Sequence, residues 1–193
     1  MPTFTENGEV EAIAAGGERY VFRPSFRAMA SLGDPQEIVR VFYRVYESPC
    51  AEDVIDVLRA CCDDELPYDL TGYSDLKNGA IEFNQGAMPY GECVCLARWL
   101  MYNGIIGLKQ IRGKGGERSD RFDPAEFVSA AMIHFGLCKA DAENMTMTEV
   151  QRALRLKYPE QAEREESMPS RDEYQEQMRK HAETLEKLKQ KAK

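Results

Sequence analysis

The sequence predicts a mainly α-helical protein: a multi-helix domain with an N-terminal β-hairpin and a C-terminal extended helix. Three observations lead to this prediction. Helix-start signals recur along the chain, apolar residues follow them at spacings of three and four, and two alternating segments flank a Gly-Gly pair near the beginning. The chain has 193 residues, 43% of them hydrophobic and 30% charged, which is enough to bury a core under a charged surface.

The N-terminal hairpin is predicted from residues 10–15 and 18–23, which alternate partly between apolar and polar side chains. Gly16 and Gly17 separate the two runs and can adopt positive φ, as a tight hairpin turn requires. A lone hairpin is marginal in water, so we expect it to pack on the helices that follow.

Five helices are expected at 35–47, 50–62, 92–103, 124–135 and 147–157. Asp34-Pro35 and Asp123-Pro124 place an N-cap acid before a proline at the first helical position, and Thr146 with Glu149 forms a capping box. A short helical turn should begin at Ser25 and end at Gly33. Four large side chains of these helices are expected to be largely buried: Phe42, Leu58, Leu100 and Phe127.

Between these helices the pattern breaks twice. Residues 63–89 are predicted to be an irregular excursion, with a short second hairpin turning at Asn78-Gly79. The glycine-rich stretch 104–121 is predicted to be a mobile loop. Residues 1–159 are thus expected to form the helical domain, and residues 160–193 a charged linker and an amphipathic helix.

The C-terminal segment is a candidate partner-binding element. Ser170 and Glu173 form a capping box, and apolar positions then recur at spacings of three and four. The candidate docking residues are Tyr174, Met178, Leu185 and Leu188. The alternative is a solvated amphipathic helix that binds nothing, since so few heptads are unstable alone.

Charge is unevenly distributed along this acidic chain, which has a formal net charge of −8. Residues 47–75 contain nine acids and one base, Arg59. Residues 109–121 are basic, and Lys109, Arg112 and Lys114 are a second set of candidate partner-binding residues. Solvated loops are the alternative for both segments. An acidic chain with one short basic stretch is not expected to bind nucleic acid.

No catalytic motif is recognisable. The chain has two histidines, His134 inside an apolar helical run and His181 in the charged tail, and it contains neither Gly-x-Ser-x-Gly nor His-Glu-x-x-His. Gly113-Lys114-Gly115-Gly116 lacks the spacing of a phosphate-binding loop. We therefore expect neither an enzyme nor a cofactor.

The six cysteines are expected to be free, buried thiols. They lie in apolar helical patterns, and neither Cys93-x-Cys95 nor His134-x-x-x-Cys138 has zinc-ligand spacing, so no metal is expected. No apolar run is long enough to span a membrane, and the N-terminus does not resemble a secretory signal. The expected location is the cytoplasm.

Three segments carry a resemblance to a known family. They are Arg23–Gly33, Phe122–Leu137 and Met145–Pro159, and together they resemble the small tail proteins of long-tailed bacteriophages and prophages, in particular the tail assembly chaperones. The resemblance implies a mainly helical protein in the host cytoplasm that holds the tape-measure protein soluble, recruits tail-tube subunits and is absent from the virion. The alternative is a structural tail or head–tail connector component. The sequence leaves open whether the protein self-associates.

Overall fold

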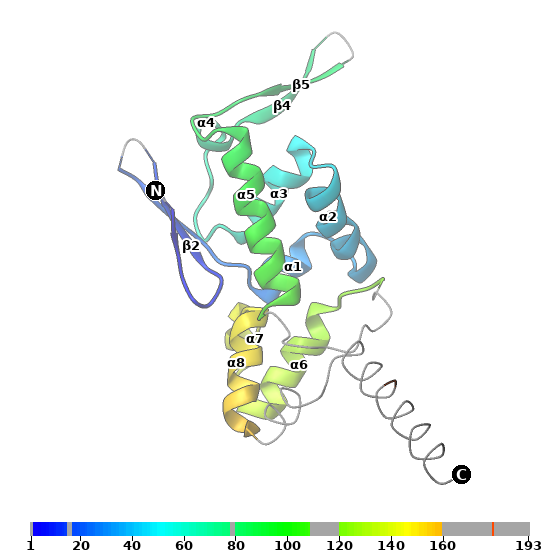
Figure 1. Ribbon diagram of the computed structural model, residues 1–193. Coiled ribbons are helices and arrows are strands. Elements are labelled where there is room, and N and C mark those ends of the chain that lie inside the picture. Colours follow the sequence, from blue (N-terminus) through cyan, green and yellow to red (C-terminus); the bar gives the residue numbers. More distant parts are fainter. Residues whose placement is uncertain (1, 15–16, 78–79, 109–119, 160–178, 180–193) are drawn as a thin grey trace, which may run out of the picture. The chain divides into compact units, whose positions relative to one another are not determined.

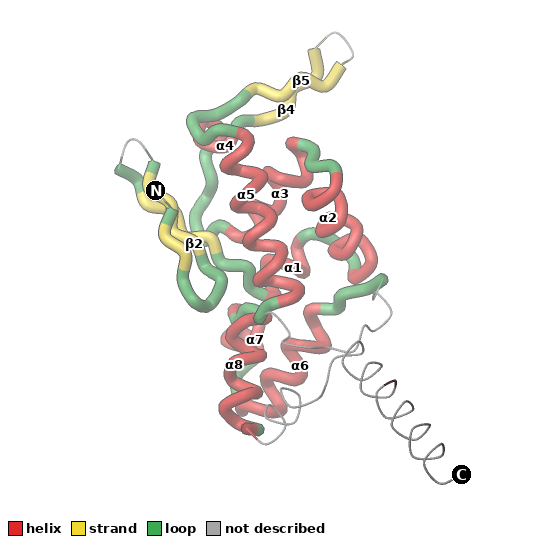
Figure 2. Tube along the Cα trace, viewed as in Figure 1, coloured by secondary structure: helices red, strands yellow, loops and turns green. Residues whose placement is uncertain are grey.

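The computed structural model describes residues 2–14, 17–77, 80–108, 120–159 and 179, and it is mainly helical, as predicted (Figure 1). Figure 2 shows the helices in red and the strands in yellow. The chain divides into two compact units. The first comprises Met1–Leu108 and Asp120–Ala153, and it contains every site described below. Of the second unit, the structure describes residues 154–159 and 179.

Three antiparallel strands form the N-terminal sheet in the order β1 (Thr3–Phe4), β2 (Val10–Ile13) and β3 (Arg19–Phe22). The predicted hairpin is confirmed as β2–β3, with Val10 opposite Phe22 and Ile13 opposite Arg19. Residues 15–16 of its turn lie outside the described residues. β1 was not predicted, because two residues are too few to show alternation.

The sheet packs on the helices as expected. Val10 and Phe22 are fully buried, and Phe22 forms an isolated β-bridge with Cys62. The backbone N–H of Arg23 donates to the carbonyl of Cys61 at 2.6 Å. The end of β3 is thereby joined to the end of the third helix.

The first three helices are α1 (Phe26–Ser31), α2 (Pro35–Glu47) and α3 (Ala51–Cys61). The predicted bounds of α2 are confirmed, and α3 is one residue shorter at each end than predicted. Asp34 Oδ1 accepts the backbone N–H groups of Gln36 and Glu37 at 3.0 and 2.8 Å, as an N-cap does. The helix start is therefore encoded locally, before any tertiary packing.

The predicted irregular excursion contains a four-residue helix and a second hairpin. Helix α4 spans Tyr68–Thr71, and β4 (Tyr73–Lys77) pairs antiparallel with β5 (Ala80–Asn84). The second hairpin is confirmed, although residues 78–79 of its turn lie outside the described part. Figure 1 shows that the hairpin leaves the helical body at α4. A single helical turn such as α4 is too short to give a periodic pattern.

Helix α5 (Tyr90–Met101) continues into a π-helical turn, η1 (Tyr102–Ile106). The sequence predicted a helix over 92–103 and a mobile loop from residue 104, whereas residues 104–106 are helical. Gly104 lets η1 approach α1, because a Cβ there would lie 2.7 Å from Met29 Sδ. Residues 109–119 of the predicted loop lie outside the described residues.

The remaining helices are α6 (Pro124–Phe135), α7 (Lys139–Asn144) and α8 (Met147–Lys157). The predicted bounds of α6 and α8 are confirmed. The six-residue α7 was not predicted, again because of its length. The predicted C-terminal extended helix lies outside the described residues. None of the helices that the structure describes is long and apolar enough to cross a membrane.

The core lies mainly among the helices, and the sheet adds Val10, Ala12 and Phe22 to it. It includes Leu58 and Leu100, which are fully buried, as predicted. Phe42 and Phe127 are less completely buried than these two leucines. Phe42 lies against Tyr46, with ring centroids 4.7 Å apart, and Phe127 stacks on Phe122 at 5.2 Å. Each ring thus contributes to an aromatic cluster at the border of the core, where it keeps some contact with solvent.

Candidate functional site

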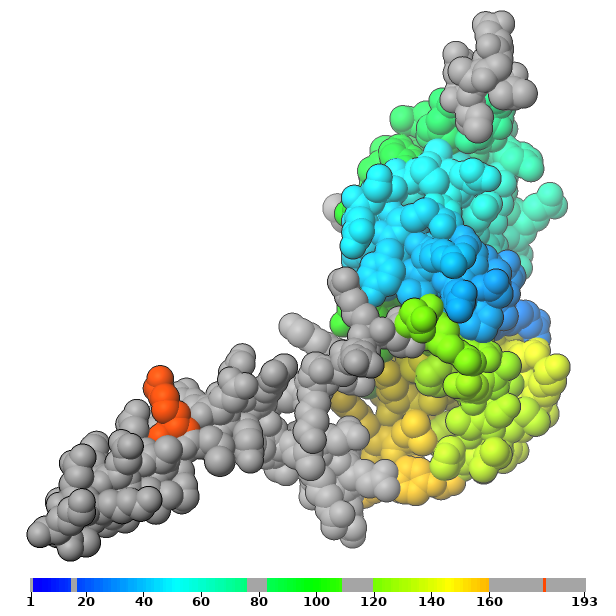
Figure 3. All heavy atoms as spheres, turned by 90° about the vertical axis from the view of Figure 1, so that its right-hand side faces the viewer, coloured from blue at the N-terminus to red at the C-terminus, as the bar shows by residue number. Residues whose placement is uncertain are grey.

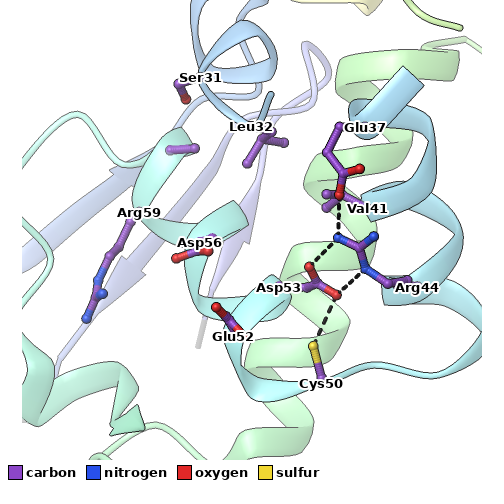
Figure 4. Close-up of a pocket in the computed structure, with 11 residues that line it drawn as sticks. Ser31, Leu32, Glu37, Val41, Arg44, Cys50, Glu52, Asp53, Asp56 and Arg59 are labelled. Atoms are coloured by element: carbon purple, nitrogen blue, oxygen red, sulfur yellow. Dashed lines mark hydrogen bonds and ion pairs between the residues drawn. The ribbon is translucent and has the colours of Figure 1, made fainter. Parts of the chain in front are cut away.

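A pocket of about 710 Å³ lies between α2 and α3, beside the end of α1. The face that these helices present to solvent is shown from blue to cyan in Figure 3. Leu32 and Val41 contribute apolar surface to the pocket. Its other lining residues are mostly charged or polar, and Figure 4 shows how they are arranged. It therefore offers a partner both apolar and electrostatic contacts.

Arg44 joins the two helices through a charged hydrogen-bond network. Its Nε and Nη2 atoms donate to the two carboxylate oxygens of Asp53 at 2.7 and 2.8 Å, and Nη2 also donates to Glu37 Oε1 at 2.9 Å. The hydrogen bonds from Arg44 lower the pKa of Asp53 and the pKa of Glu37. Both carboxylates are therefore held ionised beside a fixed cation (Figure 4).

Two further carboxylates of the pocket, Glu52 and Asp56, lie one turn apart on α3 and are exposed. Within the described part of the chain, neither forms an ion pair. Desolvation, followed by repulsion from Glu52, raises the pKa of Asp56. A partner's cation placed here would relieve this repulsion.

Cys50 lies at the end of the pocket, and its Sγ donates to Asp53 Oδ2 at 3.1 Å. Desolvation raises the pKa of this thiol, and burial likewise raises the pKa of Cys61, of Cys62 and, to about 11, of Cys93. A thiol must ionise to act as a nucleophile, so these four cysteines are poorly reactive.

The prediction that the cysteines are buried is only partly correct. Cys61 and Cys93 are buried, and Cys62 is half-buried, whereas Cys50, Cys95 and Cys138 are exposed. Cys138 is exposed because it lies before α7, where its Sγ contacts the N–H of Asp141 at 3.5 Å and caps the helix. Among the described residues, no group of three or more potential ligands is placed to hold a metal ion.

A second feature adjoins the pocket at Arg59, whose side chain points away from the Arg44 network (Figure 4). Its guanidinium carbon lies 4.2 Å from the centroid of the Tyr68 ring. Tyr68 contacts Tyr73 edge to face, with centroids 6.2 Å apart and ring planes at 87°. The two tyrosines are 59% and 44% exposed. We call Arg59, Tyr68, Tyr73 and Asn84, the residue opposite Tyr73 on β5, the hairpin-base surface.

The structure does not place the partner-binding residues that the sequence suggested. Every one of them lies outside the described residues: Tyr174, Met178, Leu185, Leu188, Lys109, Arg112 and Lys114. Arg121, at the end of the basic stretch, is described and forms ion pairs with Asp123 and Glu126 at 3.3 and 3.2 Å.

Sequence reasoning missed the pocket because its central contact joins two helices. Arg44 and Asp53 are separated by a helix end and a turn, and neither belongs to a motif. The available signal was the excess of acids over residues 47–75, which contributes Glu52, Asp53 and Asp56 to the pocket. That signal marked the region but did not indicate which carboxylates pair with an arginine.

Comparison with known families places most of this chain in one of them. A model described as "Family of unknown function (DUF6246)" matches residues 22–54 and 48–176. The protein therefore belongs to this family, and the match covers both the pocket and the hairpin-base surface. No curated protein and no solved structure matches the chain.

Proposed function

We propose that the protein is a non-enzymatic factor that binds another protein. The observation that supports this proposal is the α3 surface, where a partly apolar pocket with two carboxylates that form no ion pair within the described chain adjoins two exposed tyrosines. Exposed aromatic rings beside a concave, partly apolar surface are typical of binding interfaces.

The chemistry of the pocket favours binding over catalysis. A nucleophile needs a base in reach, and the Cys50 thiol instead donates to a carboxylate that Arg44 already holds ionised. The described histidine, His134, lies on α6 and is not among the pocket residues. Within the part that the structure describes, the pocket therefore lacks the combination of nucleophile, base and orienting group that an enzyme needs.

The resemblance to tail assembly chaperones suggests the kind of partner. In this proposal the protein acts in the host cytoplasm during phage tail morphogenesis, keeps a tape-measure-like client soluble and recruits tail-tube subunits. The alternative is a structural tail or head–tail connector component. A structural component should be present in purified particles, whereas a chaperone should be absent from them.

Charge suggests how the client is held. Glu52 and Asp56 present negative charge at the pocket, so a client segment with basic side chains should bind there. The C-terminal residues Tyr174, Met178, Leu185 and Leu188 are proposed as a second contact on the basis of their sequence pattern. The basic residues Lys109, Arg112 and Lys114 would serve acidic parts of the client.

The test is co-expression with the tape-measure protein encoded in the same phage genome, followed by affinity purification and size-exclusion chromatography. Wild-type protein should co-purify with the client, and Asp56→Lys should lose most of it because the substitution replaces one of the two carboxylates that form no ion pair within the described chain with a cation. Glu18→Lys is the matched control, since Glu18 is also an exposed carboxylate but lies beside β3.

Two further variants test the C-terminal contact. Deletion of residues 168–193, and separately Leu185→Asp with Leu188→Asp, should weaken client binding while the protein stays folded. If the wild type does not bind the tape-measure protein, or if all these variants bind it fully, the proposed client or the proposed surfaces are wrong.

A further inference from the structure

We propose that η1 is a conformational switch: α8 holds it in the π-helical form, and it becomes α-helical when α8 moves away. The switch concerns residues of the first compact unit alone, on α5, η1 and α8. It is independent of the client, and only the signal that would move α8 rests on the proposed function.

One backbone hydrogen bond defines the π-helical form of η1. The N–H of Gly107 donates to the carbonyl of Tyr102, five residues earlier, at 2.9 Å. In an α-helix the same N–H would pair with Asn103, four residues earlier. A π-helical turn is rare next to the α-helix that it continues, so contacts from outside the turn are expected to hold it.

Gln151 of α8 provides such contacts at the end of η1. Its Oε1 accepts the N–H of Leu108 at 2.6 Å, and its Nε2 donates to the carbonyl of Ile106 at 2.9 Å. Gly107 lies between these two residues with a φ of +74°, and a Cβ there would lie only 2.5 Å from Gln151 Oε1. The carboxamide of Gln151 therefore fastens η1 to α8 on both sides of a glycine that allows the close approach.

A second contact with α8 lies inside η1, at Asn103. Thr148 Oγ1 donates to Asn103 Oδ1 at 3.2 Å, and Asn103 Nδ2 donates to the carbonyl of Trp99 at 2.9 Å. Asn103 and Thr148 are both buried. If α8 moved away, the Asn103 side chain would lose this donor, and an unsatisfied buried acceptor is unfavourable. The position of α8 and the form of η1 are therefore coupled.

The location of Gln151 gives this coupling a consequence. The chain leaves the first compact unit after Leu108 and again after Ala153, and Gln151 lies beside both exits. A change from π-helix to α-helix rotates the following residue by roughly 100°, the turn of one residue. A displacement of α8 at one exit is thus converted into a rotation of the chain at the other.

The signal follows from the proposed function. The C-terminal residues proposed to contact the client continue the chain beyond α8. Client binding there is the event that would displace α8, provided that the client binds more tightly to the displaced form.

The experiment determines the register of η1 by NMR on the full-length protein without client. Scalar couplings across hydrogen bonds identify the carbonyl that accepts each amide. In the wild type, the amide of Gly107 should couple to the carbonyl of Tyr102. In the double variant Gln151→Met with Thr148→Val, which removes the hydrogen bonds at similar side-chain size, it should couple to Asn103.

Hydrogen exchange gives a second measurement. The amide of Leu108 should exchange roughly tenfold faster in the double variant, because it loses its acceptor. Thr148→Ser retains the hydroxyl and should keep the π-helical register. Gln36→Met is the matched control, since Gln36 is also a helical glutamine but lies on α2, and it should leave both measurements unchanged.

The inference is wrong if the Gly107 amide of the wild type couples to Asn103, or if the folded double variant keeps the coupling to Tyr102. If the double variant does not fold, Gln151→Met alone decides: both couplings should appear side by side, and the Tyr102 coupling alone overturns the inference. If the register stays π-helical while the tape-measure protein still co-purifies, only the switch falls. If the register changes and the tape-measure protein does not bind, the proposed client is wrong and the switch remains.

Discussion

Arg44 donates three hydrogen bonds to two carboxylates from different helices, so its charge is compensated within the protein. Asp53 has only 12% of its side chain exposed, whereas Arg44 is 44% exposed. The pair is therefore intermediate between a surface ion pair, which contributes little, and a buried pair, which is costly to break.

Replacing Arg44 with methionine should lower the free energy of unfolding by about 1 kcal/mol at neutral pH, a value reduced by solvent screening. Because the pKa of Asp53 is lowered in the folded protein, this contribution is present above the unfolded pKa of about 4 and is lost as the pH falls through the folded pKa. Urea unfolding measures this effect. The free energy of unfolding should differ between wild type and variant at pH 7, and the difference should be smaller near pH 3.

The matched control is Arg40→Met, because Arg40 is 63% exposed and, within the part of the chain that the structure describes, forms an ion pair with Glu37 and no other carboxylate. It should affect stability much less than Arg44→Met at pH 7. The contrary result is a free energy of unfolding of Arg44→Met that stays below that of the wild type by the same amount from neutral to acid pH. That result would show that Arg44 acts through packing and not through its ion pairs.

At the scale of single elements, helix starts encoded by local hydrogen bonds were the most predictable feature. Asp34 and Asp123 accept N–H groups of their own helices, and the predicted bounds of α2 and α6 are confirmed. The short elements β1, α4 and α7 depend on tertiary contacts and could not be predicted. The candidate site depends on such contacts too. Arg44 contacts Asp53 in the pocket only after α2 and α3 have packed together, and Tyr68 contacts Tyr73 only after α4 and β4 have formed.

Replacing Asp34 with alanine should lower the free energy of unfolding by about 1 kcal/mol, because the N–H groups of Gln36 and Glu37 lose their acceptor. Asp34→Asn should retain most of the stability, since asparagine is also a good N-cap. Urea denaturation followed by circular dichroism measures both. Equal stability of the alanine variant and the wild type would show that water replaces the cap without loss.

At the scale of the first compact unit, side-chain contacts of Arg23 and Trp99 add to the junction of β3 with α3 in joining the N-terminal sheet to the helices. The guanidinium of Arg23 contacts Glu9 and forms two hydrogen bonds to Glu149 at 2.8 and 2.9 Å. Trp99 on α5 donates from Nε1 to the carbonyl of Gly8 at 3.2 Å, and its ring contacts Phe4 at 4.9 Å. The sheet should therefore unfold together with the helical body.

The single tryptophan of the chain makes this cooperativity measurable. Trp99 fluorescence reports the junction between α5 and the loop that follows β1, whereas far-ultraviolet circular dichroism reports mainly the helices. If the first unit unfolds in one step, the two signals should give coincident urea transitions with the same midpoint. Phe4→Ala removes one contact of Trp99 and should shift both transitions together to lower urea. If the fluorescence transition comes clearly before the loss of helix, the sheet detaches first, and the contacts of Arg23 and Trp99 are too weak to couple it to the helices.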